Sequence, residues 1–342
     1  MFQYLMIKQD RNCKSCSLEE DALENKIVLV LMQLKGISRK TIIRRFALDP
    51  DMDCDIATLR SVIEKAGIED RRIKNISDED IKSAIDKAEE IIEQSSAEDI
   101  HIVTYLNREY PERLRYISDP PTILYYKGNI SCLNEMHAVA IIGTREPTEY
   151  GIKIARNLGS SFGKRDYVVV SGLAIGCDMY GHEGCLDEHG RTIAVMPCGL
   201  DKVYPASNKS LASKILETGG GLISEYPVKT KVFKNLFVER DRLQSGLSDG
   251  VLVVETGEWG GTMHTVNYTL DYKRILACYC HPDKYLSEPK TFGNQKLIRE
   301  GKAMAIGNND QLEEFRKKME ENKVVTKKIE ATQNTIFDYM NK

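Results

Sequence analysis

The chain has 342 residues, of which 42% are hydrophobic and 29% charged, and its formal net charge at pH 7 is -3. This length allows more than one globular domain with a full core. The near-neutral charge argues against a protein that adsorbs to duplex DNA through a generally basic surface. A local basic pocket is still enough for nucleic-acid binding.

No apolar run is long enough to span a bilayer, so we expect no membrane contact. The N-terminal segment lacks the basic start and apolar core of a signal peptide. Nine cysteines, an odd and scattered set, favour a reducing cytoplasm over a disulfide framework. Cys13 and Cys16 form one Cys-x-x-Cys pair with no second pair at zinc-ligand spacing, so we assign no metal.

Residues 1–105 are predicted to form a small all-helical domain, because residues 18–34 and 78–94 carry apolar side chains at helical spacing. Between them, residues 34–46 resemble the hairpin of a helix-hairpin-helix module, in which N–H groups at a helix N-terminus bind a phosphate. Ser38 replaces the second hairpin glycine, so a helical domain with solvated basic residues remains the alternative. The basic residues concerned are Arg39, Lys40, Arg44 and Arg45.

Residues 106–310 are predicted to form an α/β domain with a mostly parallel sheet. A short strand is expected in residues 122–128, and six more begin near residues 139, 167, 191, 221, 250 and 274. Helical patterns separate these six, which is the rhythm of an open parallel sheet. Residues 311–342 read as a charged, solvated helical tail.

Residues that can bind a ligand cluster directly after the predicted strands. Because parallel strands end along one edge of a sheet, we expect these loops to meet there. Gly143, Thr144 and Arg145 follow the first parallel strand without the G-x-G-x-x-G of a dinucleotide site, which argues against an NAD-linked oxidoreductase. Arg145 can instead donate to a phosphate or a base.

The next loop holds Ser171, Gly172 and Gly176 and opens a helix, so it could form an anion-binding nest or only a tight turn. Gly260, Gly261 and Thr262 again place glycines and a hydroxyl at a helix start. Trp259 precedes them, and it either stacks on a base or packs against its neighbours.

Two further groups lie near this edge. Asp178 and His182 are four residues apart, a spacing that suits a metal or acid–base pair but more often reflects structural hydrogen bonds. Ser224 and Glu225 follow another strand and are assigned a structural role.

Arg240 and Arg242 lie two apart on a predicted helix and must point to different sides, so one of them could pair internally. Candidate partners are Glu239 and Asp241.

Between about Tyr110 and Ala303, short motifs follow one another in a specific order: YPERL, DPPTILYYKG, GTR, SGLAIGCD, ISEYP, FVERDR and FGNQKLI. In this order they resemble the DNA-processing protein A (DprA/Smf) family. The resemblance implies an extended Rossmann-like fold that binds single-stranded DNA in a basic pocket at the strand edge. It also implies a homodimer that delivers RecA-type recombinase during natural transformation, without catalysis and without a cofactor.

Carried onto matching positions, the resemblance implies that Arg145, Arg240 and Arg242 contact DNA and that Phe237 lies beside the pocket. The family usually has Arg-Asn-Arg where this chain has Asp241 between the two arginines. The added carboxylate should weaken anion binding. Phage defence or another recombination process is an alternative to transformation.

Two other hypotheses remain open. The first is a nucleotide-binding sensor or an enzyme like the cytokinin-activating phosphoribohydrolases, whose P-G-G-x-G-T-x-x-E motif the GGTMHT stretch partly matches. No glutamate follows at that spacing, so Glu255 or Glu258 would have to replace the catalytic carboxylate. The second is an interaction scaffold with a vestigial pocket.

Overall fold

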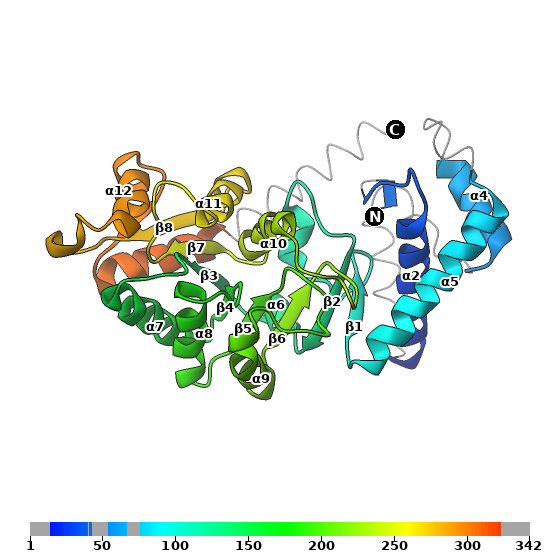
Figure 1. Ribbon diagram of the computed structural model, residues 1–342, viewed down its shortest axis with the longest axis horizontal. Helices are drawn as coiled ribbons and strands as arrows, with labels where there is room; N and C mark the ends of the chain where they lie inside the picture. The colour runs from blue at the N-terminus through cyan, green and yellow to red at the C-terminus, as the bar shows by residue number, and fades with distance from the viewer. Residues whose placement is uncertain (1–13, 40, 43–53, 67–75, 323–342) are drawn as a thin grey trace.

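A sheet of nine strands organises the described part of the chain (Figure 1). The computed structural model describes residues 14–39, 41–42, 54–66 and 76–322. The strands are β1 (His101–Thr104), β2 (Ile123–Gly128), β3 (Ala138–Ile142), β4 (Val168–Ser171), β5 (Thr192–Val195), β6 (Gly221–Ser224), β7 (Gly250–Val253), β8 (Ile275–Tyr279) and β9 (Met304–Ile306). Their order across the sheet is β1-β2-β6-β5-β4-β3-β7-β8-β9.

The β1–β2 and β2–β6 pairs are antiparallel, and all other neighbouring strands are parallel. The predicted α/β fold with a mostly parallel sheet is therefore confirmed, and β2 to β8 lie where strands are expected. The short strands β1 and β9 were not predicted, because three or four residues are too few to show a period. Residues 101–104 join the sheet although the α/β domain was expected to begin at residue 106.

The strand order reverses at β3. From β3 the chain adds β4, β5 and β6 on one side, then returns to place β7 and β8 on the other. In open parallel sheets, the loops that leave the strands diverge at such a reversal and open a crevice for ligands. Here the crevice falls between the loop after β3 and the loop after β7.

Helices cover both faces of the sheet (Figure 1). They are α6 (Cys132–Glu135), α7 (Glu149–Gly163), α8 (Cys177–Asp187), α9 (Lys209–Glu217), α10 (Lys234–Gly246), α11 (Thr262–Asp271) and α12 (Phe292–Arg299). Val139 and Ile141 of β3 pack in one cluster with α7 and α8, whereas the alternate residues Ala140 and Ile142 pack with α10, α11 and α12. Because both faces are buried, the central strands are almost entirely apolar, and the hydroxyls of Ser171, Thr192 and Ser224 at their ends donate to backbone carbonyls.

The N-terminal helices α2 (Lys14–Gln33), α4 (Ile56–Ala66) and α5 (Asp78–Ala97) share a core and pack against the β1–β2 end of the sheet. Ser77 and Asp80 form a reciprocal capping box that starts α5. The predicted helical character of this region is thus confirmed for the described residues. The hairpin hypothesis depends partly on Lys40, Arg44 and Arg45, which lie outside them, as does Cys13.

The last described segment corrects the expectation of a solvated tail. Residues 309–322 form a helix that buries Leu312, Phe315 and Met319 against the sheet, in the same cluster as α7. Its charged residues are exposed except Arg316, which is buried and donates to Ser161, so charge content alone did not predict how the helix packs. Residues 323–342 lie outside the described residues. None of the helices in the described ranges is long and apolar enough to cross a bilayer.

A buried ion pair joins the segment before β2 to the start of β7. Arg113, in the 3-10 helix η2 (Glu112–Tyr116), donates from Nε and Nη2 to the two carboxylate oxygens of Asp249, each at 2.7 Å. His137 Nδ1 and the Ala138 N–H also contact Asp249, at 3.2 and 3.0 Å. Burial by itself raises the pKa of Asp249, but the hydrogen bonds from His137 and Arg113 hold it well below its usual range.

We predict that Asp249→Asn lowers the free energy of unfolding by about 3–5 kcal/mol at pH 7, because it leaves the Arg113 charge buried without its partner. Since the folded-state pKa is depressed, the wild-type contribution is full at neutral pH. It is lost as the pH falls below about 4, the ordinary aspartate pKa. Urea titrations at pH 7 and pH 3 measure both effects.

The matched control is Asp187→Asn, which breaks the exposed pair between Asp187 and Arg156. Exposed pairs contribute less than about 1 kcal/mol, so this variant should unfold close to the wild type. Equal destabilisation by the two substitutions would contradict the assigned role of Asp249.

Candidate functional site

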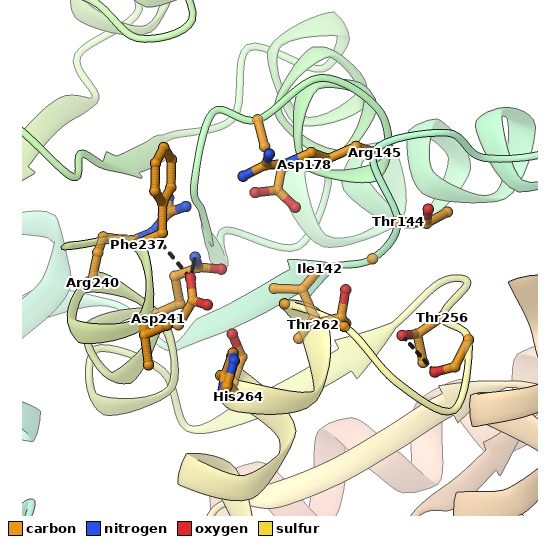
Figure 2. A pocket seen from close by; sticks show the side chains of 18 of the residues that line it. Ile142, Thr144, Arg145, Asp178, Phe237, Arg240, Asp241, Thr256, Thr262 and His264 are labelled. Carbon is orange, nitrogen blue, oxygen red and sulfur yellow. Dashed lines mark hydrogen bonds and ion pairs between the residues drawn. The ribbon is translucent and has the colours of Figure 1, made fainter. Parts of the chain in front are cut away.

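A pocket of about 430 Å³ lies at the reversal of strand order (Figure 2). It is lined by the end of β3 and the loop after it, the start of α8, one face of α10, and the loop that leads from β7 into α11. The structure therefore brings together loops that leave separate parallel strands. The predicted site residues that line the pocket are Gly143, Thr144, Arg145, Asp178, Phe237, Arg240, Gly260, Gly261 and Thr262.

Helix α10 forms one wall of the pocket. Phe237, Arg240, Asp241 and Gln244 line it, and their spacing of three, four and seven residues places them on one helix face. Figure 2 shows Phe237, Arg240 and Asp241 together on this wall, with His264 nearby. Sequence analysis missed Gln244 and His264 and did not place Asp241 in the pocket. For Gln244 and Asp241, the helical spacing from Phe237 was the available signal.

Arg240 is buried, with 4% of its surface exposed. Its Nη1 donates to the carbonyl oxygens of Gly172 and Val195, both at 2.7 Å, at the ends of β4 and β5. A Cβ on residue 172 would collide with the Arg240 guanidinium, so glycine is required there for close approach. Arg240 thus anchors α10 to the sheet. With the buried carboxylates of Asp178 and Asp241, its guanidinium forms the inner part of the pocket, called the floor below.

Arg242 does not face the pocket, which corrects the expectation that it contacts the ligand. Its Nη2 donates to both carboxylate oxygens of Glu225, at 2.6 and 2.7 Å, and both side chains are buried. Arg39, from the helical region, lies 3.4 Å from the same carboxylate. Two residues on from Arg240, Arg242 must lie on another helix face, and its partner is Glu225 rather than Glu239 or Asp241.

Two carboxylates lie in the pocket beside Arg240. Asp178 accepts a hydrogen bond from the Gly172 N–H at 3.0 Å, and burial raises its pKa although Arg240 opposes the shift. Asp241 lies 3.2 Å from Arg240 Nε and accepts from Gln244 Nε2 at 3.2 Å. Burial raises the pKa of Asp241 to about 6, again against the effect of Arg240. The floor therefore carries both signs of charge, whereas a basic pocket was expected.

The rim is cationic and aromatic. Arg145 is exposed, and its guanidinium lies 5.2 Å from the centre of the Phe237 ring. Phe237 in turn meets Tyr204 edge to face at 5.5 Å. On the α11 side, Trp259 is 86% exposed, and the Lys296 ammonium lies 5.5 Å from its ring. Trp259 therefore does not pack into the core, and its ring is accessible for stacking.

The two glycine-rich loops differ in their roles. Gly260, Gly261 and Thr262 line the pocket at the start of α11, where the helix presents its positive end. Gly176, by contrast, has φ of +93° and lies against the Thr144 carbonyl, which accepts from the Cys177 N–H at 3.1 Å. The loop before α8 thus packs against the loop after β3, as expected of a tight turn.

The remaining predicted residues are held by the scaffold. Ser171 Oγ donates to the Ile141 carbonyl at 2.6 Å, and Ser224 Oγ donates to the Cys198 carbonyl at 2.7 Å. His182 Nδ1 lies 2.6 Å from Thr192 Oγ1, and burial lowers the pKa of His182 to about 3. Asp178 and His182 therefore do not contact each other, and their hydrogen bonds fit the structural role that was the alternative to an acid–base pair. No cluster of three His, Cys, Asp or Glu side chains suited to a metal occurs in the described residues.

The glutamates required by the phosphoribohydrolase hypothesis lie outside the pocket. Glu255 accepts from Thr148 N and Oγ1 at 2.8 and 2.6 Å and lies 3.3 Å from His281. Glu258 pairs with Lys296 at 3.3 Å. Neither side chain lines the pocket, so neither is placed to replace the missing catalytic carboxylate.

Comparison with known proteins gives consistent matches. Residues 101–317 match the family model described as DNA recombination-mediator protein A. The chain is 31% identical over 279 residues to DNA processing protein DprA of Bacillus subtilis, covering 82% of this chain and 91% of the relative. It is 33% identical over 227 residues to the protein Smf of Synechocystis, covering 65% of this chain and 56% of the relative.

Solved structures also match the fold. DNA processing protein A from Streptococcus pneumoniae superposes with a TM-score of 0.68 at 25% identity, covering 84% of this chain and 96% of that chain. DNA processing protein A from Helicobacter pylori, described for its single-stranded DNA binding mode, gives 0.57 at 28% identity, covering 65% and 96%. With the sheet topology, these matches show that the chain belongs to the DNA recombination-mediator protein A (DprA/Smf) family.

Proposed function

We propose that this protein binds single-stranded DNA at the pocket where the strand order reverses. Bases enter the pocket or stack at its rim, and phosphates lie against Arg145 and the start of α11. The observation that carries the proposal is the exposed Arg145 guanidinium held over the Phe237 ring at the mouth of the pocket. The Helicobacter pylori relative described for its single-stranded DNA binding supports the same ligand.

Charge supports phosphate binding at the rim and not on the floor. Arg145 is exposed and can form two hydrogen bonds to a phosphate, whereas Asp178 and Asp241 would repel an anion placed between them. Gly260 and Gly261 have open space around them, so a sugar-phosphate backbone can approach the start of α11.

Stacking supports a preference for single strands. Phe237 and Trp259 line the pocket, the Trp259 ring is exposed, and any base can stack on an aromatic ring. In a duplex the bases are paired and stacked on one another, so they must be flipped out before they can reach these rings. Single strands avoid that cost.

We also propose that the protein is not an enzyme and acts in the cytoplasm as a homodimer that protects single-stranded DNA and helps load a RecA-type recombinase. Family membership supports this role. The engagement of Glu255 and Glu258 outside the pocket supports binding without glycosidic cleavage. In a filament assay, the protein should speed recombinase assembly on strands already coated by a single-strand-binding protein; no acceleration would contradict this part of the proposal.

Arg145→Ala is expected to weaken binding of a thymidine oligomer about 10- to 150-fold, since a charge-assisted hydrogen bond contributes about 1.5–3 kcal/mol. The slope of log affinity against log salt should become shallower by about 0.7 for each phosphate that the variant no longer neutralises. Fluorescence anisotropy titrations at several salt concentrations measure both quantities, with a duplex of the same length as a comparison.

The matched control is Arg156→Ala, which removes an exposed arginine on α7 that pairs with Asp187. It changes the net charge equally but lies away from the pocket lining, so the affinity should stay near that of the wild type. If both variants bind equally, whether weakened or not, Arg145 has no specific role.

Trp259→Ala is expected to reduce affinity for the same oligomer about 5- to 150-fold, because a base stacked on an aromatic ring contributes about 1–3 kcal/mol. Its salt slope should match that of the wild type, since no charge is removed. Tyr116→Ala, at an exposed aromatic outside the pocket lining, is the control and should bind normally. A change in salt slope without loss of affinity would contradict stacking at Trp259.

A further inference from the structure

Asp241 is a carboxylate in a pocket proposed to bind a polyanion. Its side chain is 11% exposed and lies on the α10 wall, among the residues that line the pocket. Arg240 Nε and Gln244 Nε2 both contact its Oδ1, each at 3.2 Å. Within the described residues, Oδ1 accepts a single hydrogen bond, from Gln244, and Oδ2 accepts none, so each oxygen can accept one more.

Asp178 differs from Asp241 in this respect. Asp178 is 6% exposed, its Oδ2 accepts a hydrogen bond from the backbone N–H of Gly172, and the N–H of Ala174 also favours its charged form. Arg240 uses Nη1 on two carbonyl oxygens and only partly neutralises Asp241. Of the two carboxylates in the pocket, Asp241 is therefore the one with acceptor capacity to spare.

A buried carboxylate selects for N–H donors. The Watson–Crick edge of guanine presents the ring N1–H and the exocyclic amino group side by side, which matches the two oxygens of a carboxylate. Cytosine and adenine present one amino group next to a ring nitrogen that is an acceptor. Thymine presents a single N–H between two carbonyl oxygens, and these would face the carboxylate unfavourably.

The other walls are compatible with a purine. A volume of about 430 Å³ lies within the range of small-molecule pockets, about 300–1,000 Å³. The Thr262 hydroxyl and the His264 ring line the same pocket and offer donors for the guanine O6 (Figure 2). The Phe237 ring provides an aromatic face at the mouth.

We propose that Asp241 makes this pocket selective for guanine, which it binds through paired hydrogen bonds from N1–H and the 2-amino group. This inference rests on the proposed function in that the guanine belongs to a single DNA strand whose phosphates contact the rim. The carboxylate that weakens phosphate binding thereby supplies base discrimination. A free guanine nucleotide offers the same chemistry and is a separate arm of the test.

The protonation of Asp241 makes the proposed guanine preference depend on pH. Burial raises the pKa of Asp241 to about 6, so the carboxylate is charged at pH 8 and mostly protonated at pH 5. The charged or titratable groups that face it are Arg240 on the same helix, Asp178 on α8, His264 on α11 and Arg145 in the loop after β3. Because a protonated Asp241 no longer offers two acceptor oxygens, we predict that the preference for guanine declines as the pH falls through 6.

The test compares a thymidine oligomer with the same oligomer carrying one central guanosine or one central inosine, which lacks only the 2-amino group. The wild type should bind the guanosine strand about 5- to 150-fold more tightly than the all-thymidine strand, as for a good bidentate contact to a base. Inosine should lose most of this gain. Equal affinity for guanosine and inosine strands would overturn the proposal without any variant.

Asp241→Asn should abolish the guanosine preference at every pH and bind the all-thymidine strand at least as tightly as the wild type, because a negative charge is removed. Retained thymidine binding also shows that the variant is folded. The same titrations in a His264→Gln background separate Asp241 from His264; guanine preference that still declines towards pH 5 supports Asp241. A preference that survives Asp241→Asn overturns the proposal.

Binding of free deoxyguanosine monophosphate is measured as the last arm of the test. Strand binding that depends on salt but not on the base would leave the proposed function standing and overturn guanine selection. If no strand bound while the nucleotide bound in an Asp241-dependent way, guanine recognition would stand and the proposed function would fall. Under the full proposal the guanosine strand binds more tightly than the nucleotide, and Arg145→Ala removes that difference.

Discussion

The buried guanidinium of Arg240 is the constraint on which the rest of the pocket depends. It holds the carbonyl oxygens of Gly172 and Val195, which end two neighbouring parallel strands, and so fixes α10 across the carboxyl edge of the sheet. That position sets Phe237 at the mouth of the pocket and Asp241 on its wall. An arginine with 4% exposure needs such acceptors, because a buried cation without them would be costly.

Charge is divided between the rim and the floor of this pocket. The exposed cation and the aromatic rings lie outside, whereas Asp178 and Asp241 lie within. A chain with a net charge of -3 can therefore present a local site for a polyanion without a basic surface elsewhere. Under the proposed function, the same division separates tasks: the rim supplies salt-sensitive affinity, and the floor supplies contacts to a base.

A second buried pair links the pocket to the N-terminal helices. Glu225 holds Arg242 on the far face of α10 and lies 3.4 Å from Arg39. Arg39, one of the basic residues of the predicted hairpin, thus contacts the sheet domain. Helix α10 is therefore held through Arg240 on one face and through Arg242 on another.

The sequence by itself determined the open parallel sheet, because the central strands are apolar runs buried on both faces and several of them end in glycine or small polar residues. It also determined that loops after separate strands meet at one edge, and that Arg240 and Arg242 point apart, because two residues on a helix are about 200° apart. Only the tertiary structure decided which arginine faces the pocket, since Glu225, the partner of Arg242, is distant in sequence. It likewise decided that residues 309–322 pack on the sheet and that Asp241 lies in the pocket, because burial depends on contacts between segments that no local pattern records.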